Sequence, residues 1–192
     1  YDNGVNRYPD PHQKALKQQI AKMKGVSTNQ LFIGNGSDEA IDLCFRIFCE
    51  PGLDNVVSIS PTYGMYSVAA AINNISVREV PLSKDDYLLS TSAMLAAADE
   101  HTRLMWICSP NNPRGNAFPQ SQLETLAEQF QGVLVADEAY ADFSSEKSML
   151  SVIDKHPNMI VLQTLSKAWG MAGLRLGLAF ASPRIAELFA RV

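Results

Sequence analysis

The stretch MIVLQTLSKAWGMAGLRLG, residues 159–177, joins an apolar run to a turn that carries one lysine and one arginine. Its first four residues have the length and β-branching of a buried strand, so Lys167 comes just after a predicted strand end. Small and apolar neighbours would partly desolvate the lysine ammonium group, which favours the neutral, nucleophilic amine. Eight residues later, Arg175 lies among glycines that would let the backbone approach a bound phosphate. Alternatively, both side chains are solvated charges on a loop, because charged residues are mostly exposed.

Short apolar runs alternate with helical patterns along the rest of the chain. Strands are predicted at residues 31–33, 56–59, 77–80, 104–108, 133–136, 159–162 and 178–181. Six helices are predicted: from Pro11 to Gly25, through Ile41 and Phe48, from the alanines after Tyr66 to Asn74, around Met94, after Pro119, and from Pro183 to Val192. Asp10 is expected to cap the first of them, and Ser121 and Glu124 are expected to form a capping box at the start of the fifth. This alternation predicts one three-layer α/β/α domain over residues 1–192. Its central sheet would be mostly parallel, with ligands bound beyond the carboxyl ends of the strands.

The composition excludes several classes of protein. The 192 residues are 46% hydrophobic and 19% charged, as in globular proteins, and no run approaches the roughly 20 apolar residues that span a membrane. A net charge of −4 argues against a nucleic-acid partner. Three cysteines without CxxC spacing predict buried free thiols in a reducing cytoplasm. The histidines are predicted to be surface residues rather than metal ligands, because they stand far apart at His12, His101 and His156.

Three turns that follow predicted strands carry side chains suited to a cofactor. The turn GNGSDE at 34–39 leads into a helix, so free backbone N–H groups and the Ser37 hydroxyl could bind a phosphate. Tyr63 follows the next strand and could stack on a ring. Asn112, in the loop SPNNPRG at 109–115, could donate to an oxygen anion of that ring. For each of them, turn chemistry or core packing is the alternative.

A carboxylate follows the apolar run at 133–136. Asp137 at the end of such a strand must find a positive partner, because an unpaired buried charge is costly, so we expect a cation beside it. Tyr140 could turn its hydroxyl toward the same place. An aspartate that caps a helix would explain this position nearly as well.

A single cofactor accounts for all of these features. Pyridoxal 5'-phosphate needs a lysine that forms a Schiff base with its aldehyde and an acidic partner for its ring nitrogen. It also offers a phosphate, a ring face and a phenolic oxygen. The matching residues are Lys167 for the aldehyde, Asp137 for the pyridine nitrogen, Ser37 and Arg175 for the phosphate, Tyr63 for the ring face, and Asn112 and Tyr140 for the phenolic oxygen.

The same motifs resemble those of the large domain of fold-type I aminotransferases, a pyridoxal-phosphate family. Within that group the chain is most similar to the histidinol-phosphate aminotransferases, through NRYPDP at 6–11 and FCEPG at 48–52. The resemblance spans nearly all of the chain. The five ordered motifs are GNGSDE at 34–39, PTYGMY at 61–66, SPNNPRG at 109–115, DEAY at 137–140, and TLSK at 164–167 with Arg175 eight residues later.

The resemblance implies a role for each matching residue. Lys167 would carry the Schiff base and Asp137 would keep the pyridine nitrogen protonated. Tyr140 and Asn112 would hydrogen-bond the phenolic oxygen, with Tyr63 stacked on the ring. The active unit would be a homodimer that transfers the amino group of histidinol phosphate to 2-oxoglutarate, giving imidazole-acetol phosphate and glutamate in histidine biosynthesis. The phosphate would be surrounded by Ser37, Asp38, Thr164, Ser166 and Arg175, together with Tyr8 from the neighbouring subunit.

Related activities on the same fold are alternatives: another amino-acid aminotransferase, a phosphothreonine decarboxylase, or a regulatory domain that binds the cofactor without catalysis. The chain departs from the family at Arg114, where a threonine usually follows Asn-Asn-Pro; the arginine could alter the loop or add an anion contact. The family's enzymes are also longer, with an N-terminal segment and a C-terminal small domain that carries an arginine for the substrate carboxylate. We therefore expect this chain to be a large-domain fragment that is inactive by itself.

Overall fold

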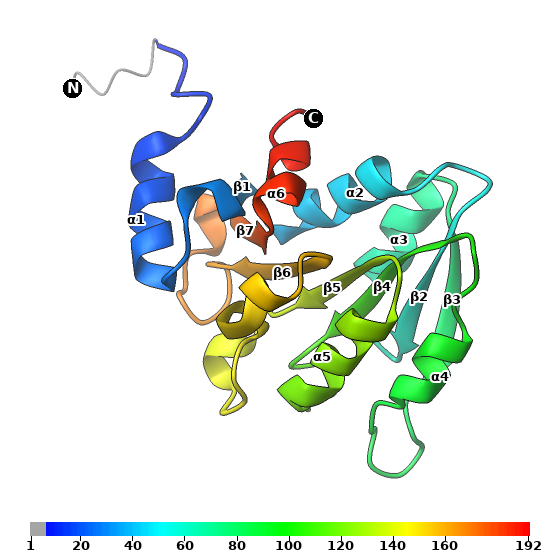
Figure 1. Ribbon diagram of the computed structural model, residues 1–192. Coiled ribbons are helices and arrows are strands. Elements are labelled where there is room, and N and C mark those ends of the chain that lie inside the picture. Colours follow the sequence, from blue (N-terminus) through cyan, green and yellow to red (C-terminus); the bar gives the residue numbers. More distant parts are fainter. Residues whose placement is uncertain (1–6) are drawn as a thin grey trace.

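A computed structural model describes residues 7–192 of the chain. A seven-stranded sheet forms its centre, in the order β1-β7-β6-β5-β4-β2-β3 (Figure 1). The strands are β1 (Leu31–Asn35), β2 (Asn55–Ser60), β3 (Ser76–Pro81), β4 (Thr102–Cys108), β5 (Val133–Asp137), β6 (Met159–Thr164) and β7 (Leu176–Ala181). The α-helices are α1 (Lys14–Lys24), α2 (Ser37–Phe48), α3 (Met65–Ile72), α4 (Thr91–Ala96), α5 (Gln120–Gln129) and α6 (Pro183–Phe189). The 3₁₀ helices are η1 (Thr28–Gln30), η2 (Ala141–Phe143), η3 (Met149–Lys155) and η4 (Ala172–Leu174).

Six of the strands run in one direction, and β7 runs against both of its neighbours, β6 and β1. The prediction of a mostly parallel sheet is therefore confirmed, although the reversal of β7 was not foreseen. We call the edge that holds the ends of the six strands and the start of β7 the C-terminal rim. The opposite edge is the N-terminal rim. Because β7 is reversed, Arg175 just before it lies on the C-terminal rim with the ends of the other strands.

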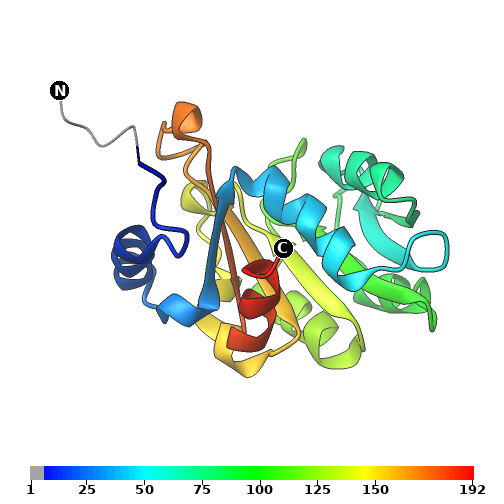
Figure 2. The ribbon, with the colours of Figure 1, turned by 90° about the horizontal axis from the view of Figure 1, so that it is seen from above.

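Helices cover both faces of the sheet, which gives the predicted three layers (Figure 1). Helices α2, α3 and α6 pack on one face, in a core that includes Phe45 and Trp106, and Figure 2 shows α2 and α6 lying over the sheet. Helices α1, α4 and α5 and the short helix η3 pack on the other face, around Met94 and Leu126. Every residue of β6 is consequently buried, because a strand covered on both sides has no solvated face.

All seven predicted strands lie within observed ones, whereas helix ends were harder to predict. Helix α1 begins at Lys14, three residues later than predicted, because the Asp10 carboxylate accepts the backbone N–H groups of His12 and Lys14 and holds a turn there. Its predicted end is confirmed, since Gly25 follows it with a left-handed φ of 70°.

Two other helix predictions are wrong. Helix α5 begins at Gln120 with Pro119 before it, so Ser121 lies inside the first turn and no side chain caps the helix. The predicted capping box at Ser121 therefore does not form. Helix α6 ends at Phe189, short of the predicted end at Val192.

Two predictions about single residue types have different outcomes. The three cysteines, Cys44, Cys49 and Cys108, are free and buried, as expected. His156 is not a surface residue, because it is 5% exposed and its Nε2 lies 3.4 Å from a carboxylate oxygen of Glu124. Within residues 7–192, no helix has the length and apolar character required to cross a membrane.

Candidate active site

The turn between β1 and α2 lies directly against the start of β7 on the C-terminal rim. A Cβ atom at Gly177 would lie 2.0 Å from the carbonyl carbon of Gly36 and 2.2 Å from the nitrogen of Ser37, so only glycine permits this approach. Gly36 has a φ of 85°, and no side chain caps α2. The first N–H groups of α2 and the Ser37 hydroxyl can therefore meet an anion at the positive end of the helix dipole.

Arg175 adds a cation at the same turn. A Cβ atom at Gly36 would lie 2.6 Å from Nη2 of Arg175, so the guanidinium group rests on the glycine backbone. The Gly36 N–H donates to the Arg175 carbonyl at 2.9 Å, which ties the two segments together. Arg175 has a φ of 52° and is exposed. A guanidinium group beside the start of a helix suits a phosphate in both charge and hydrogen-bonding geometry.

The Thr164 hydroxyl connects the end of β6 to the start of β7 beside this turn. Thr164 Oγ1 donates to the Leu176 carbonyl at 3.2 Å and accepts the Ser166 N–H at 3.2 Å. It also lies 3.1 Å from Oγ of Ser166. The structure thus brings Thr164 and Ser166 to the same rim as Arg175.

Lys167 shares the C-terminal rim with Asp137 and Tyr140. Its Nζ lies 5.4 Å from the centre of the Tyr140 ring. The predicted partial desolvation of its ammonium group is wrong, because Lys167 is exposed along with the rest of the segment 167–175. The sequence did predict that Lys167 and Asp137 lie near each other. Lys167 follows β6 and Asp137 ends β5, and these two strands pair in parallel.

Asp137 is only 2% exposed. Its Oδ2 accepts a hydrogen bond of 2.5 Å from the Tyr66 hydroxyl, and its Oδ1 accepts the Ala139 N–H at 3.1 Å. Burial raises the pKa of this carboxyl, while the Tyr66 hydroxyl, the Ala139 N–H and the charge of Lys167 lower it. Among the described residues, no cation forms an ion pair with Asp137, although the charge of Lys167 acts on it; its side-chain hydrogen-bond partner is the phenol of Tyr66. Sequence reasoning missed Tyr66, although its position three residues after Tyr63 at the start of a helix was a usable signal.

Tyr63 and Asp38 form a pair next to this carboxylate. The Tyr63 hydroxyl donates to Oδ1 of Asp38 at 3.2 Å. Burial and the nearby Asp38 charge raise the pKa of Tyr63 to about 12. The Tyr63 ring meets that of Tyr66 edge-on at 5.7 Å. The carboxylate of Asp38, which was predicted to lie beside a phosphate, accepts the hydroxyl of the tyrosine that was predicted to stack on the ring.

The two asparagines of the loop after β4 have different surroundings. Asn111 is 2% exposed; its amide donates to the Pro61 carbonyl at 2.9 Å and its carbonyl oxygen accepts from the Thr62 hydroxyl at 3.2 Å. Asn111 therefore fixes the loop, a role that the sequence did not reveal. Asn112 is half-buried and, with Tyr140, lines a cavity of about 580 Å³ on the C-terminal rim.

Arg114 in the same loop stacks on Tyr87, with its guanidinium carbon 3.5 Å from the centre of the ring. Its Nη2 also donates to the Tyr87 hydroxyl. Arg114 was expected either to alter the loop or to add an anion contact. The structure favours an altered loop, because the guanidinium group joins the loop after β4 to the segment that contains Tyr87.

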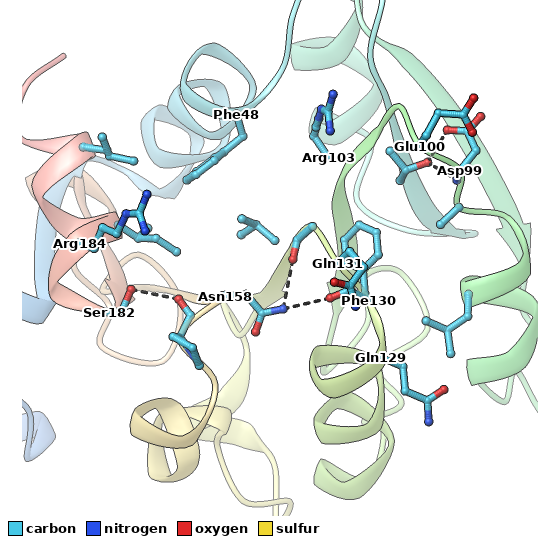
Figure 3. A pocket seen from close by; sticks show the side chains of 18 of the residues that line it. Phe48, Asp99, Glu100, Arg103, Gln129, Phe130, Gln131, Asn158, Ser182 and Arg184 are labelled. Atoms are coloured by element: carbon cyan, nitrogen blue, oxygen red, sulfur yellow. Dashed lines mark hydrogen bonds between the residues drawn. The ribbon is translucent and has the colours of Figure 1, made fainter.

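Other parts of the chain do not join this group. Tyr8 is fully exposed, at 102%, and no hydrogen bond among the described residues links it to the rim. The rest of the predicted arm, residues 1–6, lies outside the described residues. A larger cavity of about 1250 Å³ opens on the N-terminal rim, away from every predicted site residue (Figure 3). Its wall includes Phe48, Arg103 and Arg184, and Asn158 donates there to the Phe130 and Gly132 carbonyls.

The sequence is similar to that of aminotransferases throughout. A family model described as aminotransferase class I and II matches residues 2–192. The chain is 55% identical over 180 residues to the histidinol-phosphate aminotransferase of Parabacteroides distasonis, and the match covers 94% of this chain and 52% of that protein. It is 52% identical over 192 residues to the histidinol-phosphate aminotransferase of Bacteroides thetaiotaomicron, covering 100% of this chain and 55% of that protein.

Solved structures share the fold. The histidinol-phosphate aminotransferase from Sinorhizobium meliloti in complex with pyridoxal-5'-phosphate is 29% identical with a TM-score of 0.89, over 100% of this chain and 53% of that one. A mutant aspartate aminotransferase from Thermus thermophilus is 23% identical with a TM-score of 0.84, over 96% of this chain and 54% of that one, and shows the common fold alone. The chain spans about half the length of the curated relatives that it matches.

Proposed function

The chain belongs to the aminotransferase class I and II family, and from this premise we propose that the protein is a pyridoxal-phosphate-dependent aminotransferase that acts on histidinol phosphate. The observation that carries the proposal is the convergence of Lys167, Asp137 and Arg175 on one rim of the sheet, although they come from separate segments. The choice of substrate is supported by curated relatives named histidinol-phosphate aminotransferase, which are 55% and 52% identical to this chain.

The residues present fit this cofactor. The backbone of Gly36, the start of α2 and the Arg175 guanidinium group lie together, and their donors and positive charge suit a phosphate. Ser37, Thr164 and Ser166 would supply further hydroxyl donors there. Asp38 would act indirectly, by holding the Tyr63 hydroxyl at 3.2 Å so that the ring of Tyr63 covers one face of the cofactor.

Four side chains of this chain would carry the chemistry. When bound, pyridoxal phosphate supplies an aldehyde carbon that binds amines and a ring that delocalises the electron pair left when a Cα–H bond breaks. Lys167 Nζ would bind the aldehyde carbon and, once displaced by the amino substrate, would move the proton from the substrate Cα. Asp137 would hold a proton on the pyridine nitrogen, and Tyr140 and Asn112 would donate to the phenolic oxygen. The acceptor of the amino group would be 2-oxoglutarate.

The proposal includes a homodimer in the cytoplasm. In that assembly the exposed Tyr8 of one subunit would reach the cofactor phosphate of the other. The buried free thiols support a reducing compartment, because disulfides are rare where thiols are kept reduced.

Half-reactions of the full-length protein test the proposal. Loaded with pyridoxal phosphate, it should convert histidinol phosphate to the corresponding ketone at least about tenfold faster than free aromatic amino acids, as expected if a buried polar site recognises the substrate phosphate. The measurement is the rate of the absorbance change of the cofactor on mixing. Equal rates would contradict the substrate assignment, and carbon dioxide release from phosphothreonine would favour the decarboxylase alternative.

A further inference from the structure

A buried tyrosine lies directly against the aspartate of the candidate active site. The Tyr66 hydroxyl donates to Oδ2 of Asp137 over 2.5 Å, and the tyrosine is 0% and the aspartate 2% exposed. Tyr66 belongs to α3 and Asp137 ends β5, so the bond joins segments 71 residues apart. Such a bond fixes a carboxylate relative to a second element of the fold.

We propose that Tyr66 is a positioning residue for Asp137, whose carboxylate it keeps ionised and aimed at the pyridine nitrogen of the cofactor. The inference rests on the proposed function, which assigns that nitrogen to Asp137. Because Tyr66 is fully buried, it would act through the carboxylate rather than by touching substrate.

An aromatic stack holds the hydroxyl in position. The Tyr66 ring stacks on that of Trp106 with centroids 4.7 Å apart, and Trp106 stacks in turn on Phe45 at 5.4 Å. All three side chains are 0% exposed. Tyr63 closes the outer side with its edge-on contact at 5.7 Å. A tyrosine side chain has few rotatable bonds, so a ring packed between neighbours leaves its hydroxyl little freedom.

The hydroxyl matters because the carboxylate is buried. Burial favours the neutral acid and raises the pKa of Asp137, whereas the bond from Tyr66 favours the ionised form. Burial and the Asp137 charge raise the pKa of Tyr66 well above its usual value, so the phenol keeps its proton and stays a donor. A carboxylate offers about four lone-pair sites, so Asp137 can accept from Tyr66, from the Ala139 N–H and from a protonated pyridine nitrogen together.

Other titratable groups face Asp137 from the neighbouring elements, but none of those described forms a side-chain hydrogen bond to it. Asp38 raises its pKa and Lys167 lowers it, each through its charge alone. Tyr66 is therefore the side chain whose change would act most directly on this carboxylate. The facing groups are Asp38 in α2, Lys167 after β6, Cys108 in β4 and Tyr63 before α3. Burial raises the pKa of Cys108 and that of Tyr63 to about 12.

Tyr66→Phe tests the inference, because phenylalanine keeps the ring on Trp106 and removes only the hydroxyl. In the full-length protein without cofactor, carbon-13 labelling of aspartate carboxyls reports the pKa of Asp137, assigned by the signal that is missing from Asp137→Asn. Loss of a hydrogen bond to a charged group should raise this pKa by about one unit. The acid limb of the affinity for pyridoxal phosphate should move to higher pH by the same amount. Titration of the cofactor itself is the same in all variants. A difference in the acid limb between Tyr66→Phe and the unaltered protein therefore reports a titrating group of the protein.

Thr102→Val is the matched control. Thr102 is 5% exposed, and its hydroxyl donates to Oδ1 of Asn55 at 2.7 Å on the N-terminal rim. The control loses a buried hydroxyl, and with it some stability, but both pH measurements should stay unchanged. A shift confined to Tyr66→Phe supports the inference. Unchanged measurements in folded Tyr66→Phe, or an equal shift in Thr102→Val, would overturn it.

A second variant decides the question if Tyr66→Phe does not fold. A fluorinated tyrosine at position 66 keeps the shape of the side chain and makes its hydroxyl a stronger donor. The pKa of Asp137 should then fall, and the acid limb of the affinity for pyridoxal phosphate should move to lower pH. If neither changes, the inference is overturned. If the unaltered protein binds no pyridoxal phosphate at any pH, the proposed function fails instead, and the cofactor-free titration still decides the role of Tyr66.

Discussion

The two rims of the sheet differ both in the volume of their cavities and in the ion pairing of their charged side chains, and the larger cavity is not the one beside the candidate active site. The N-terminal rim has the larger one, about 1250 Å³ against about 580 Å³ on the C-terminal rim. Two of the charged side chains in its wall are paired, Arg103 with Asp54 at 3.1 Å and Asp99 with Arg78. On the C-terminal rim, neither Lys167 nor Arg175 forms an ion pair with any carboxylate in the described part of the chain.

This difference teaches that strand direction, rather than the size of a hollow, decides where chemistry gathers. In a mostly parallel sheet, strand ends and helix starts meet at one rim, and residues far apart in sequence converge there. Cations without partners at that rim can bind an anionic ligand, whereas paired charges at the other rim contribute to stability. Substitutions on the C-terminal rim should therefore change function, whether or not they also change stability, and those on the N-terminal rim should not change function.

Lys167→Ala should give the largest effect. Without the amine, neither cofactor attachment nor proton transfer at the substrate Cα can proceed, so we expect kcat to fall about 10⁴-fold or more. The measurement is steady-state transamination by the full-length protein. Arg184→Ala removes a cation from the N-terminal cavity and should leave the rate unchanged. A similar loss in both variants would break the distinction between the rims.

Asp137→Asn should lower kcat about 10²- to 10³-fold with little change in KM, because a neutral amide cannot hold a proton on the pyridine nitrogen. Its effect on stability should be small or favourable near neutral pH. Burial raises the pKa of Asp137, so the folded protein gives up part of its stability as the pH rises through that pKa and the carboxyl ionises. Thermal unfolding of the cofactor-free variant across pH measures this, and strong destabilisation at neutral pH would contradict it.

Gly177→Ala should weaken cofactor binding about tenfold and destabilise the fold by about 1–3 kcal/mol, because its Cβ would overlap the turn before α2. Gly173→Ala is the matched control, since no atom lies within 4 Å of a Cβ at that position. Titration with pyridoxal phosphate and denaturant unfolding give the two values. Equal behaviour of the two variants would show that the contact between β7 and α2 does not shape the site.

Asp54→Asn on the N-terminal rim should leave cofactor affinity unchanged and alter only the pH dependence of stability. Burial alone would raise the pKa of Asp54, but the Glu50 N–H and Arg103 together bring it below its usual value of 3.8. The aspartate therefore adds stability above that pH and loses it as the pH falls through the lowered pKa. Unfolding curves of the two proteins should converge in acid. A change in cofactor affinity would contradict the separation of the rims.

The sequence was sufficient to predict the strands and the rim that carries the site. Apolar runs such as 133–136 and 159–162 identify buried strands, and the polar residues just beyond them, Asp137 and Lys167, must then share an edge. Only the direction of the strands is needed to infer that most of the predicted site residues lie on the C-terminal rim. This inference does not depend on knowing any contact between side chains.

The contacts themselves could not be predicted. The bond from Tyr66 to Asp137 joins α3 to β5, and periodicity shows that a residue is buried without showing what it touches. The exposure of Lys167 depends on what packs over its loop, which its small neighbours do not determine. The reversal of β7 had a signal in the short connection at 165–175, which contains no α-helix, because a parallel crossover needs a longer one.

Mapping the attached lysine tests the central claim most directly. The full-length protein is loaded with pyridoxal phosphate, reduced with borohydride, digested, and its peptides are identified by mass spectrometry. We expect the pyridoxyl group on the peptide that contains Lys167. Its attachment to a lysine elsewhere, such as Lys24 or Lys155, would contradict the assignment of the C-terminal rim as the active site.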